Sequence, residues 1–281
     1  MLQVRLEPGL PGGRWACIRG LRGHDEQALA RGGGGMAAVE LLDRLLVETP
    51  GTSVGPGRAW ELAVSDRDRL LAAVYASTFT DQIESEVPCE QCGEGSDVSF
   101  SLAAFVASID ASEDSLREAG VVGPDPDGAY SLADGTRFRL PTSVDQRALL
   151  GEALDRRRLT LLRACILADQ DHAEGRTASD MSGELLDRVE AAMELVGPTL
   201  DQHLSVDCHE CGARRDIRFD IQHFLLRALE HEHRYLVREV HYLACSYGWS
   251  RAEILDLSRD ERRAYVELVA AERAARQSRS L

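Results

Sequence analysis

The sequence predicts an α+β protein made of two related halves, followed by a helical region. Three observations lead to this prediction: two Cys-x-x-Cys motifs, a residue pattern that repeats around them, and apolar stripes at helical spacing in the last third of the chain. Strict alternation of apolar and polar residues is typical of a half-buried strand, whereas apolar residues three and four positions apart are typical of an amphipathic helix.

The two motifs are Cys89-Glu90-Gln91-Cys92 and Cys208-His209-Glu210-Cys211, which lie 119 positions apart (208 minus 89). Alternating residues follow each motif, over residues 97–102 and 216–221, and predict a strand in each half. At the offset of 119, nine positions match without a gap: Val87, Cys89, Cys92, Gly93, Asp97, Val98, Phe100, Leu102 and Phe105 meet Val206, Cys208, Cys211, Gly212, Asp216, Ile217, Phe219, Ile221 and Phe224.

The cysteine spacing is typical of a zinc knuckle. Two residues between the cysteines let a tight turn point both sulfurs at one ion, and the glycine that follows suits a turn with positive φ. One motif supplies two ligands, but a closed tetrahedral site needs four. The simplest interpretation is one structural Zn²⁺ per chain, shared by both knuckles; two ions would require further ligands. The predicted metal ligands are Cys89, Cys92, Cys208 and Cys211.

Other roles for these cysteines fit the pattern less well. A redox motif normally opens a helix in a βαβ unit, whereas both motifs here precede predicted strands. Disulfides belong to oxidising compartments, and the start of the chain, Met1–Arg5, lacks the features of a secretory signal. A degenerate site without metal is disfavoured by the four intact cysteines. Catalytic zinc is disfavoured because four thiolates leave no position for water.

Composition narrows the class of partner. The 281 residues include 47 acidic and 32 basic side chains, which give a net charge of −15. This charge disfavours nucleic acid and anionic membrane surfaces as partners. The sequence also contains no apolar stretch near the roughly 20 residues that span a bilayer. We therefore expect a cytoplasmic protein with no nucleic-acid and no membrane partner.

No pattern in the sequence predicts catalysis. A Gly-rich phosphate loop, a nucleophile elbow and a zinc-protease helix are all missing. His231 and His233 lie two positions apart on a predicted helix, where they point in different directions, so they indicate a solvated face rather than a second metal site. We therefore expect that the protein is not an enzyme, that it has no catalytic or cofactor-binding residues, and that it binds no small-molecule substrate.

We expect each half to contain a strand, a helix, a zinc knuckle and a second strand. The first half begins with a strand at residues 60–64 and a helix from Ser65. The second begins with a strand at 138–140 and a helix opened by Asp145, so that Asp66 and Asp145 align at an offset of 79. A separate helix is expected from about Met36 to Val47.

The second half is longer because it contains a helical insert, with a polar loop at 169–182 and a helix at 183–196. In the C-terminal region, one long helix is expected to end before Gly248, and a capping box formed by Ser258 and Glu261 opens the last helix. The predicted organisation is a poorly ordered segment 1–35, a first half 36–111, an acidic connection 112–135 with a short helix at 114–118, a second half 136–222 and a helical region 223–281.

Several phrases of the chain resemble a known family. Residues 239–250 read EVHYLACSYGWS, followed by Glu253-Ile254-Leu255-Asp256-Leu257 and Arg262-Arg263-Ala264-Tyr265, and residues 138–145 read FRLPTSVD. Together with the paired knuckles, these phrases resemble the baseplate-hub protein family of T-even type phages, as found in phage-tail-like contractile injection systems. The resemblance covers roughly Trp60 to Leu268. It implies a structural or assembly role in a baseplate, without catalysis, and other baseplate or tail proteins as partners.

Two aromatic side chains are candidate partner-binding residues. Tyr247 and Trp249 flank the glycine after the long helix, and exposed aromatic residues are common interface anchors, although packing as core is the alternative. The main functional hypothesis is a structural protein of a phage-like particle. The alternative is a cytosolic zinc-ribbon module that regulates or binds nucleic acid, for which the second knuckle offers Arg214, Arg215 and Arg218. A thiol redox protein is a third, weaker option.

Overall fold

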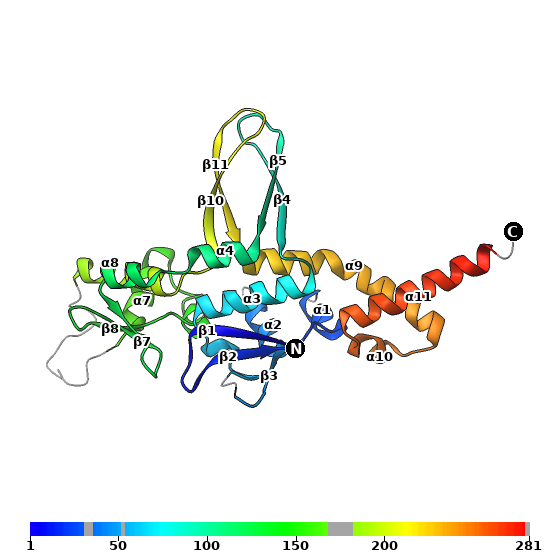
Figure 1. Cartoon of the computed structure of the whole chain (residues 1–281), viewed down its shortest axis with the longest axis horizontal. Helices are drawn as coiled ribbons and strands as arrows, with labels where there is room; N and C mark the ends of the chain where they lie inside the picture. The colour runs from blue at the N-terminus through cyan, green and yellow to red at the C-terminus, as the bar shows by residue number, and fades with distance from the viewer. Residues whose placement is uncertain (31–35, 52–53, 168–181, 279–281) are drawn as a thin grey trace.

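The computed structural model describes residues 1–30, 36–51, 54–167 and 182–278. Two β-hairpins project together from a body of helices and short strands, and the last helices extend away from the body at one end (Figure 1). The combination of helices with small antiparallel sheets confirms the predicted α+β class.

The N-terminal part of the body is a three-stranded sheet with the order β1-β2-β3, packed with two helices. Its elements are β1 (Leu2–Leu10), β2 (Gly13–Ile18), α1 (Gly23–Ala30), α2 (Ala37–Leu45) and β3 (Leu46–Val47). The helix predicted near residues 36–47 is therefore confirmed, with its last two residues in a short strand instead.

The expectation that residues 1–35 are poorly ordered is wrong for residues 1–30. Leu6, Ala16 and Ile18 are buried in the main core, so apolar packing holds both strands in place. The segment is rich in glycine and arginine, a composition that favours a poorly ordered chain. Gly12, however, lies in the hairpin turn with a φ of +94°, a conformation that favours glycine. Residues 31–35 lie outside the described part of the chain.

A unit made of a helix, a β-hairpin and a second helix occurs twice in the chain. Each element of the second copy starts 119 residues after its counterpart in the first (183 minus 64, 201 minus 82, 214 minus 95 and 221 minus 102). The first set is α3 (Val64–Thr78), β4 (Gln82–Pro88), β5 (Gly95–Ser101) and α4 (Leu102–Ile109); the second is α8 (Gly183–Val196), β10 (Asp201–Asp207), β11 (Arg214–Asp220) and α9 (Ile221–Tyr247). We call the two hairpins together the tower.

Strands β5 and β11 confirm the strands predicted at 97–102 and 216–221, except for the last residue of each. The Ser101 side chain accepts a hydrogen bond from a backbone N–H of α4, and the Asp220 side chain does the same for α9. These N-caps satisfy free donors at the helix ends, so each strand turns directly into a helix at Leu102 or Ile221.

The strand predicted at residues 60–64 is wrong. Residues Ala59–Glu61 form a 3₁₀-helix (η1), and Ala63 makes a single bridge to Thr142. The counterpart of α3 is α8, which shares the pattern Asp-Arg-(Leu/Val)-x-Ala-Ala at residues 68–73 and 187–192. The offset of 79 therefore does not describe the structural repeat, because it aligns the 15-residue α3 with the six-residue α6.

A second core lies beside the first, around a four-stranded antiparallel sheet with the order β6-β7-β8-β9. Val121, Tyr130 and Leu132 are buried in this core, so the segment 112–135 belongs to it and is more than a connection. The elements between α4 and α8 are α5 (Glu113–Glu118), β6 (Val121–Val122), β7 (Ala129–Leu132), β8 (Arg137–Arg139), α6 (Ser143–Ala148), α7 (Leu154–Cys165) and β9 (Ile166–Leu167).

Most local predictions for this region are confirmed. The short helix is α5, the strand at 138–140 is β8, and the insert helix is α8 with the predicted bounds. The predicted polar loop at 169–182 lies outside the described residues except for Ser182, which caps α8 by accepting a hydrogen bond from a backbone N–H.

The C-terminal region is helical as predicted. Helix α9 ends at Tyr247, and Gly248 follows it with a φ of +70° in a left-handed C-cap. Two short connections then lead into α10 (Arg251–Asp256) and α11 (Arg259–Ser278). The predicted capping box is present, because Ser258 and Glu261 each accept a hydrogen bond from the other's backbone N–H. We call α10, α11 and the end of α9 the arm.

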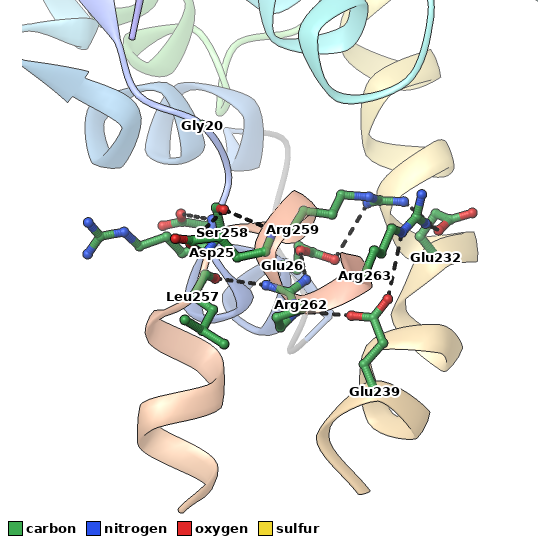
Figure 2. A network of polar contacts seen from close by, with 12 residues as sticks. Gly20, Asp25, Glu26, Glu232, Glu239, Leu257, Ser258, Arg259, Arg262 and Arg263 are labelled. Carbon is green, nitrogen blue, oxygen red and sulfur yellow. Dashed lines mark hydrogen bonds and ion pairs between the residues drawn. The ribbon is translucent and has the colours of Figure 1, made fainter. Parts of the chain in front are cut away.

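Buried ion pairs attach the arm to the body (Figure 2). The side chain of Arg262 in α11 is 0% exposed and pairs with Glu26 of α1 and, at 3.0 Å, with Glu239 of α9. Arg259 lies beside it, with a nitrogen 3.6 Å from a Glu26 oxygen and a second contact to Glu232. This Arg–Glu junction joins residues 236 positions apart in the chain.

A second buried polar group lies at the start of α3. The Asp66 carboxylate accepts hydrogen bonds from the backbone N–H groups of Glu7 (2.5 Å) and Gly9 (2.8 Å) in β1. Arg67 donates to the side chain of Gln146 at 2.7 Å, and Asp68 accepts from the backbone N–H of Leu200 at 3.0 Å. Because these partners belong to three different parts of the molecule, this turn of helix connects all of them.

We predict that Asp66 makes the folded protein more stable in mild acid than at neutral pH. Burial raises the pKa of Asp66 to about 6, against the opposing effect of the β1 amides. Its folded pKa therefore exceeds the unfolded value, so its stabilising contribution is complete below about pH 4 and is lost as pH rises to about 6. The shift of about two units corresponds to roughly 3 kcal/mol.

The measurement is the free energy of unfolding of the wild type and of Asp66→Asn between pH 4 and 8. Asparagine does not titrate, so the difference in the free energy of unfolding between the two proteins reports the titration of Asp66. The difference should change across pH 4–6 and stay constant above that range. A difference independent of pH would contradict the prediction.

We also predict that Arg262→Met destabilises the protein by about 3–5 kcal/mol, because it leaves Glu26 and Glu239 buried without their shared partner. Arg263→Met is the matched control. Arg263 is 47% exposed and pairs with Glu232 at 2.7 Å, so its loss should cost less than about 1 kcal/mol. Denaturant unfolding of both variants gives the comparison, and equal costs would show that burial of the junction is unimportant.

Candidate metal centre

The first knuckle is a tight turn at the tip of the β4–β5 hairpin. Cys89 donates its backbone N–H to the Glu94 carbonyl at 2.8 Å, and its own carbonyl accepts from Gly93 at 2.8 Å. Gly93 has a φ of +79°, which a residue with a Cβ adopts only with strain. The turn therefore needs the glycine that follows the motif.

The second knuckle repeats this geometry at the tip of the β10–β11 hairpin. Cys208 donates to the Ala213 carbonyl at 2.9 Å and accepts from Gly212 at 2.9 Å. Gly212 has a φ of +69°. The two turns are thus equivalent in backbone geometry as well as in sequence.

The tower brings all four predicted ligands together. Their sulfur atoms all lie within 4.8 Å of one another. The Sγ atoms of Cys89 and Cys211 are 3.7 Å apart, and those of Cys92 and Cys208 are 3.8 Å apart. Four sulfurs at about 2.3 Å from a tetrahedral ion would be roughly 3.8 Å from one another. The sulfurs therefore surround one position of the size that a tetrahedral metal ion needs.

The two cysteines of each knuckle differ in environment. Cys89 and Cys208, the first of each pair, are buried, whereas Cys92 and Cys211 are exposed. Backbone N–H groups of Cys211 and Glu210 lower the pKa of Cys208 to about 6, and those of Cys92 and Gln91 likewise lower the pKa of Cys89. Each turn therefore stabilises the negative charge that its first sulfur would carry as a metal ligand.

The second cysteines are shifted in the opposite direction when no metal is bound. The Glu94 amide lowers the pKa of Cys92, but partial desolvation of the sulfur and hydrogen bonds to the neighbouring thiols outweigh it and raise that pKa to about 12. The Ala213 amide likewise lowers the pKa of Cys211, but partial desolvation and the Cys208 thiol outweigh it, so that this pKa is also raised. Four sulfurs this close cannot all ionise without a cation, so metal binding and deprotonation are coupled.

Aromatic side chains pack between the two hairpins at the base of the tower, away from the cysteines. The rings of Phe100 and Phe219 meet edge to face at 5.2 Å, and Phe105 contacts both rings at 5.4 and 5.5 Å. Phe100 and Phe219 occupy the same position of the 119-residue repeat (219 minus 100). The hairpins are therefore joined by a phenylalanine cluster at the base and by four sulfurs at the tip.

Other residues singled out from the sequence lie elsewhere. Tyr247 and Trp249 stack on each other at 4.7 Å, and Trp249 meets Tyr265 of α11 edge to face at 5.0 Å, so they pack within the arm. Tyr247 is nevertheless 39% exposed, and its role as a partner anchor stays a prediction. Glu232, between the two histidines, belongs to the Arg–Glu junction.

Within the described ranges, the four cysteines form the one group of three or more potential metal ligands. Helices in that part of the chain lack the combined length and apolar character that a membrane span requires. No protein-family model, curated protein or solved structure matches the chain.

We predict that Cys89→Ser and Cys208→Ser lower the melting temperature by similar amounts, because each removes the buried first cysteine of one knuckle from the same four-sulfur cluster. Metal content per chain, measured on anaerobically purified protein, should fall in both variants. Cys245→Ser, at an exposed cysteine in α9, is the control and should change neither quantity. A large effect from one knuckle alone would show that the two pairs act independently.

Proposed function

We propose that this protein is a non-enzymatic structural or assembly component of the baseplate of a phage-like contractile tail or injection system, stabilised by one zinc ion. The observation that carries the proposal is the convergence of four sulfurs from two hairpins far apart in the chain. A metal bound there would link the two hairpins at their tips, whereas the phenylalanine cluster links them at the base. The resemblance of residues 60–268 to baseplate-hub proteins supplies the biological context.

The donor set supports zinc as the metal. Four thiolates in tetrahedral arrangement suit Zn²⁺ or iron. Colour and redox activity distinguish the two metals, because zinc is colourless and does not change oxidation state. When bound, the ion would supply cross-linking and charge, with every coordination position taken by sulfur. Such a closed site supports a structural role.

The shape of the molecule supports an assembly role. The tower and the arm both extend from the body and leave it in different directions (Figure 1). A protein with two projecting elements is suited to contact two neighbours at once. The buried Arg–Glu junction gives the arm a defined orientation relative to the body, which a scaffold component requires.

Charge on the tower argues for a protein partner over nucleic acid. Residues 82–101 contain five acidic and no basic side chains. In the other hairpin, Arg214 and Arg218 lie close to Asp207 and Asp201, at 3.6 and 2.6 Å. The basic residues near the second knuckle therefore do not form the unpaired basic face that nucleic-acid binding uses. The zinc-ribbon regulator remains the alternative function.

Deletion of the gene in the phage or bacterium that encodes it tests the role in assembly. We expect fewer intact contractile particles by electron microscopy, with wild-type protein and Cys245→Ser restoring them. Cys89→Ser should restore fewer, because it weakens the tower. Normal particle numbers in the deletion strain would contradict the proposal. Salt-sensitive binding of the purified protein to DNA or RNA would support the alternative instead.

A further inference from the structure

Besides the sulfurs and the phenylalanines, two polar side chains at equivalent positions of the repeat contact the opposite hairpin. They are Ser96 and Arg215 (215 minus 96 is 119). Ser96 is 4% exposed, and its hydroxyl donates to the Cys208 sulfur of the opposite hairpin at 3.7 Å. Each position follows the alternation of its strand and faces the other hairpin, as do Phe100 and Phe219 further along. The repeat therefore places one polar side chain from each hairpin beside the opposite knuckle.

Arg215 fills this position in the second hairpin. Its Nη1 donates to the backbone carbonyls of Val87 at 3.1 Å and Pro88 at 2.8 Å, the two residues directly before Cys89. Its Nε and Nη2 atoms are buried and have no hydrogen-bond partner among the residues that the structure describes. A buried guanidinium N–H without a partner is costly, so these donors favour a further acceptor nearby, and a negatively charged one suits the charge of the guanidinium.

The metal centre supplies such a charge. Four thiolates and one Zn²⁺ carry a net charge of −2 (−4 plus 2), and the first hairpin adds five carboxylates and no basic residue. Arg214 and Arg218, the other basic residues of the tower, lie on exposed positions with carboxylate partners. Arg215 is therefore the cation of the tower that is directed toward the cysteine end and lacks a carboxylate partner among the described residues.

We propose that Arg215 is a positioning residue of the metal centre: it holds the backbone that leads into Cys89 and offsets the negative charge of the metal-bound thiolates. This inference rests on the proposed zinc site. Groups outside the ligand shell that orient and balance ligands commonly change metal affinity by 10–100-fold when they are removed. The pseudo-symmetric partner, Ser96, provides only a neutral hydrogen bond, so the charge comes from one hairpin.

The test compares Arg215→Gln, Arg215→Lys and the control Arg218→Gln, each loaded with Zn²⁺. Glutamine keeps a donor for the Val87 and Pro88 carbonyls but removes the charge, whereas lysine keeps the charge. Zinc affinity is measured by competition with a chromophoric chelator at neutral pH. We expect Arg215→Gln to bind zinc about 10–100-fold more weakly than the wild type, Arg215→Lys to recover part of the loss, and Arg218→Gln to match the wild type.

A spectroscopic measurement separates charge from packing. In Co²⁺-substituted protein, sulfur-to-cobalt charge-transfer bands report the electron density on the thiolates, so Arg215→Gln should shift them to lower energy and Arg218→Gln should not. Unchanged affinity and bands in Arg215→Gln, or a lysine variant weaker than the glutamine variant, would overturn the inference and leave the zinc site standing. A wild-type protein that binds no zinc would instead overturn the proposed function.

Discussion

Three consecutive residues at the start of α3 hold together parts of the chain that would otherwise be independent. Asp66 binds the backbone of β1, Arg67 reaches Gln146 at the edge of the second core, and Asp68 holds the backbone of Leu200. Leu200 directly precedes β10, and the other end of α3 leads into β4. Helix α3 is therefore joined to the base of both hairpins. Its C-terminal end leads into β4 of the first hairpin, and Asp68 near its N-terminal end binds the residue before β10 of the second.

The geometry of the four-cysteine cluster follows from this arrangement. Hairpins of equal length, rooted on the same helix, place their knuckles at the same height above the body, and the phenylalanine cluster sets the distance between them at the base. Two sulfur pairs, one from each diagonal of the hairpins, then lie at 3.7 and 3.8 Å, close to the spacing of tetrahedral ligands. A metal ion would close a loop of well over a hundred residues, which limits the freedom of the unfolded chain more than a local site would.

Polar groups connect the modules of this protein where apolar contacts alone would leave their relative positions less specific. The α3 turn and the Arg–Glu junction are buried, yet both consist mainly of charged side chains. Buried ion pairs add little net stability compared with apolar packing, but a misaligned one is costly, so they select a single arrangement. This property suits a protein whose tower and arm are proposed to meet different neighbours in an assembly.

The sequence by itself determined the features that depend on spacing over a few residues. The Cys-x-x-Cys-Gly pattern specified the four clustered cysteines and the turns, alternation specified the strands after them, and the capping box of Ser258 and Glu261 specified the start of the last helix. Composition was misleading for residues 1–30, because glycines in hairpin turns resemble those of a loose segment. The apolar pattern at 60–64 was also misleading, because these residues span the end of a 3₁₀-helix, a single bridge at Ala63 and the first residue of α3.

The tertiary structure alone decided which distant groups meet. The equivalence of α3 and α8 was visible in the pattern at residues 68–73 and 187–192, but the shorter offset of 79 obscured it. The partners of Asp66, Arg215 and Arg262 had no local signal, because each residue lies in a short run of charged residues, which is typical of a solvent-exposed position. Their burial depends on contacts across up to 236 residues, and such contacts are set by the packing of whole elements.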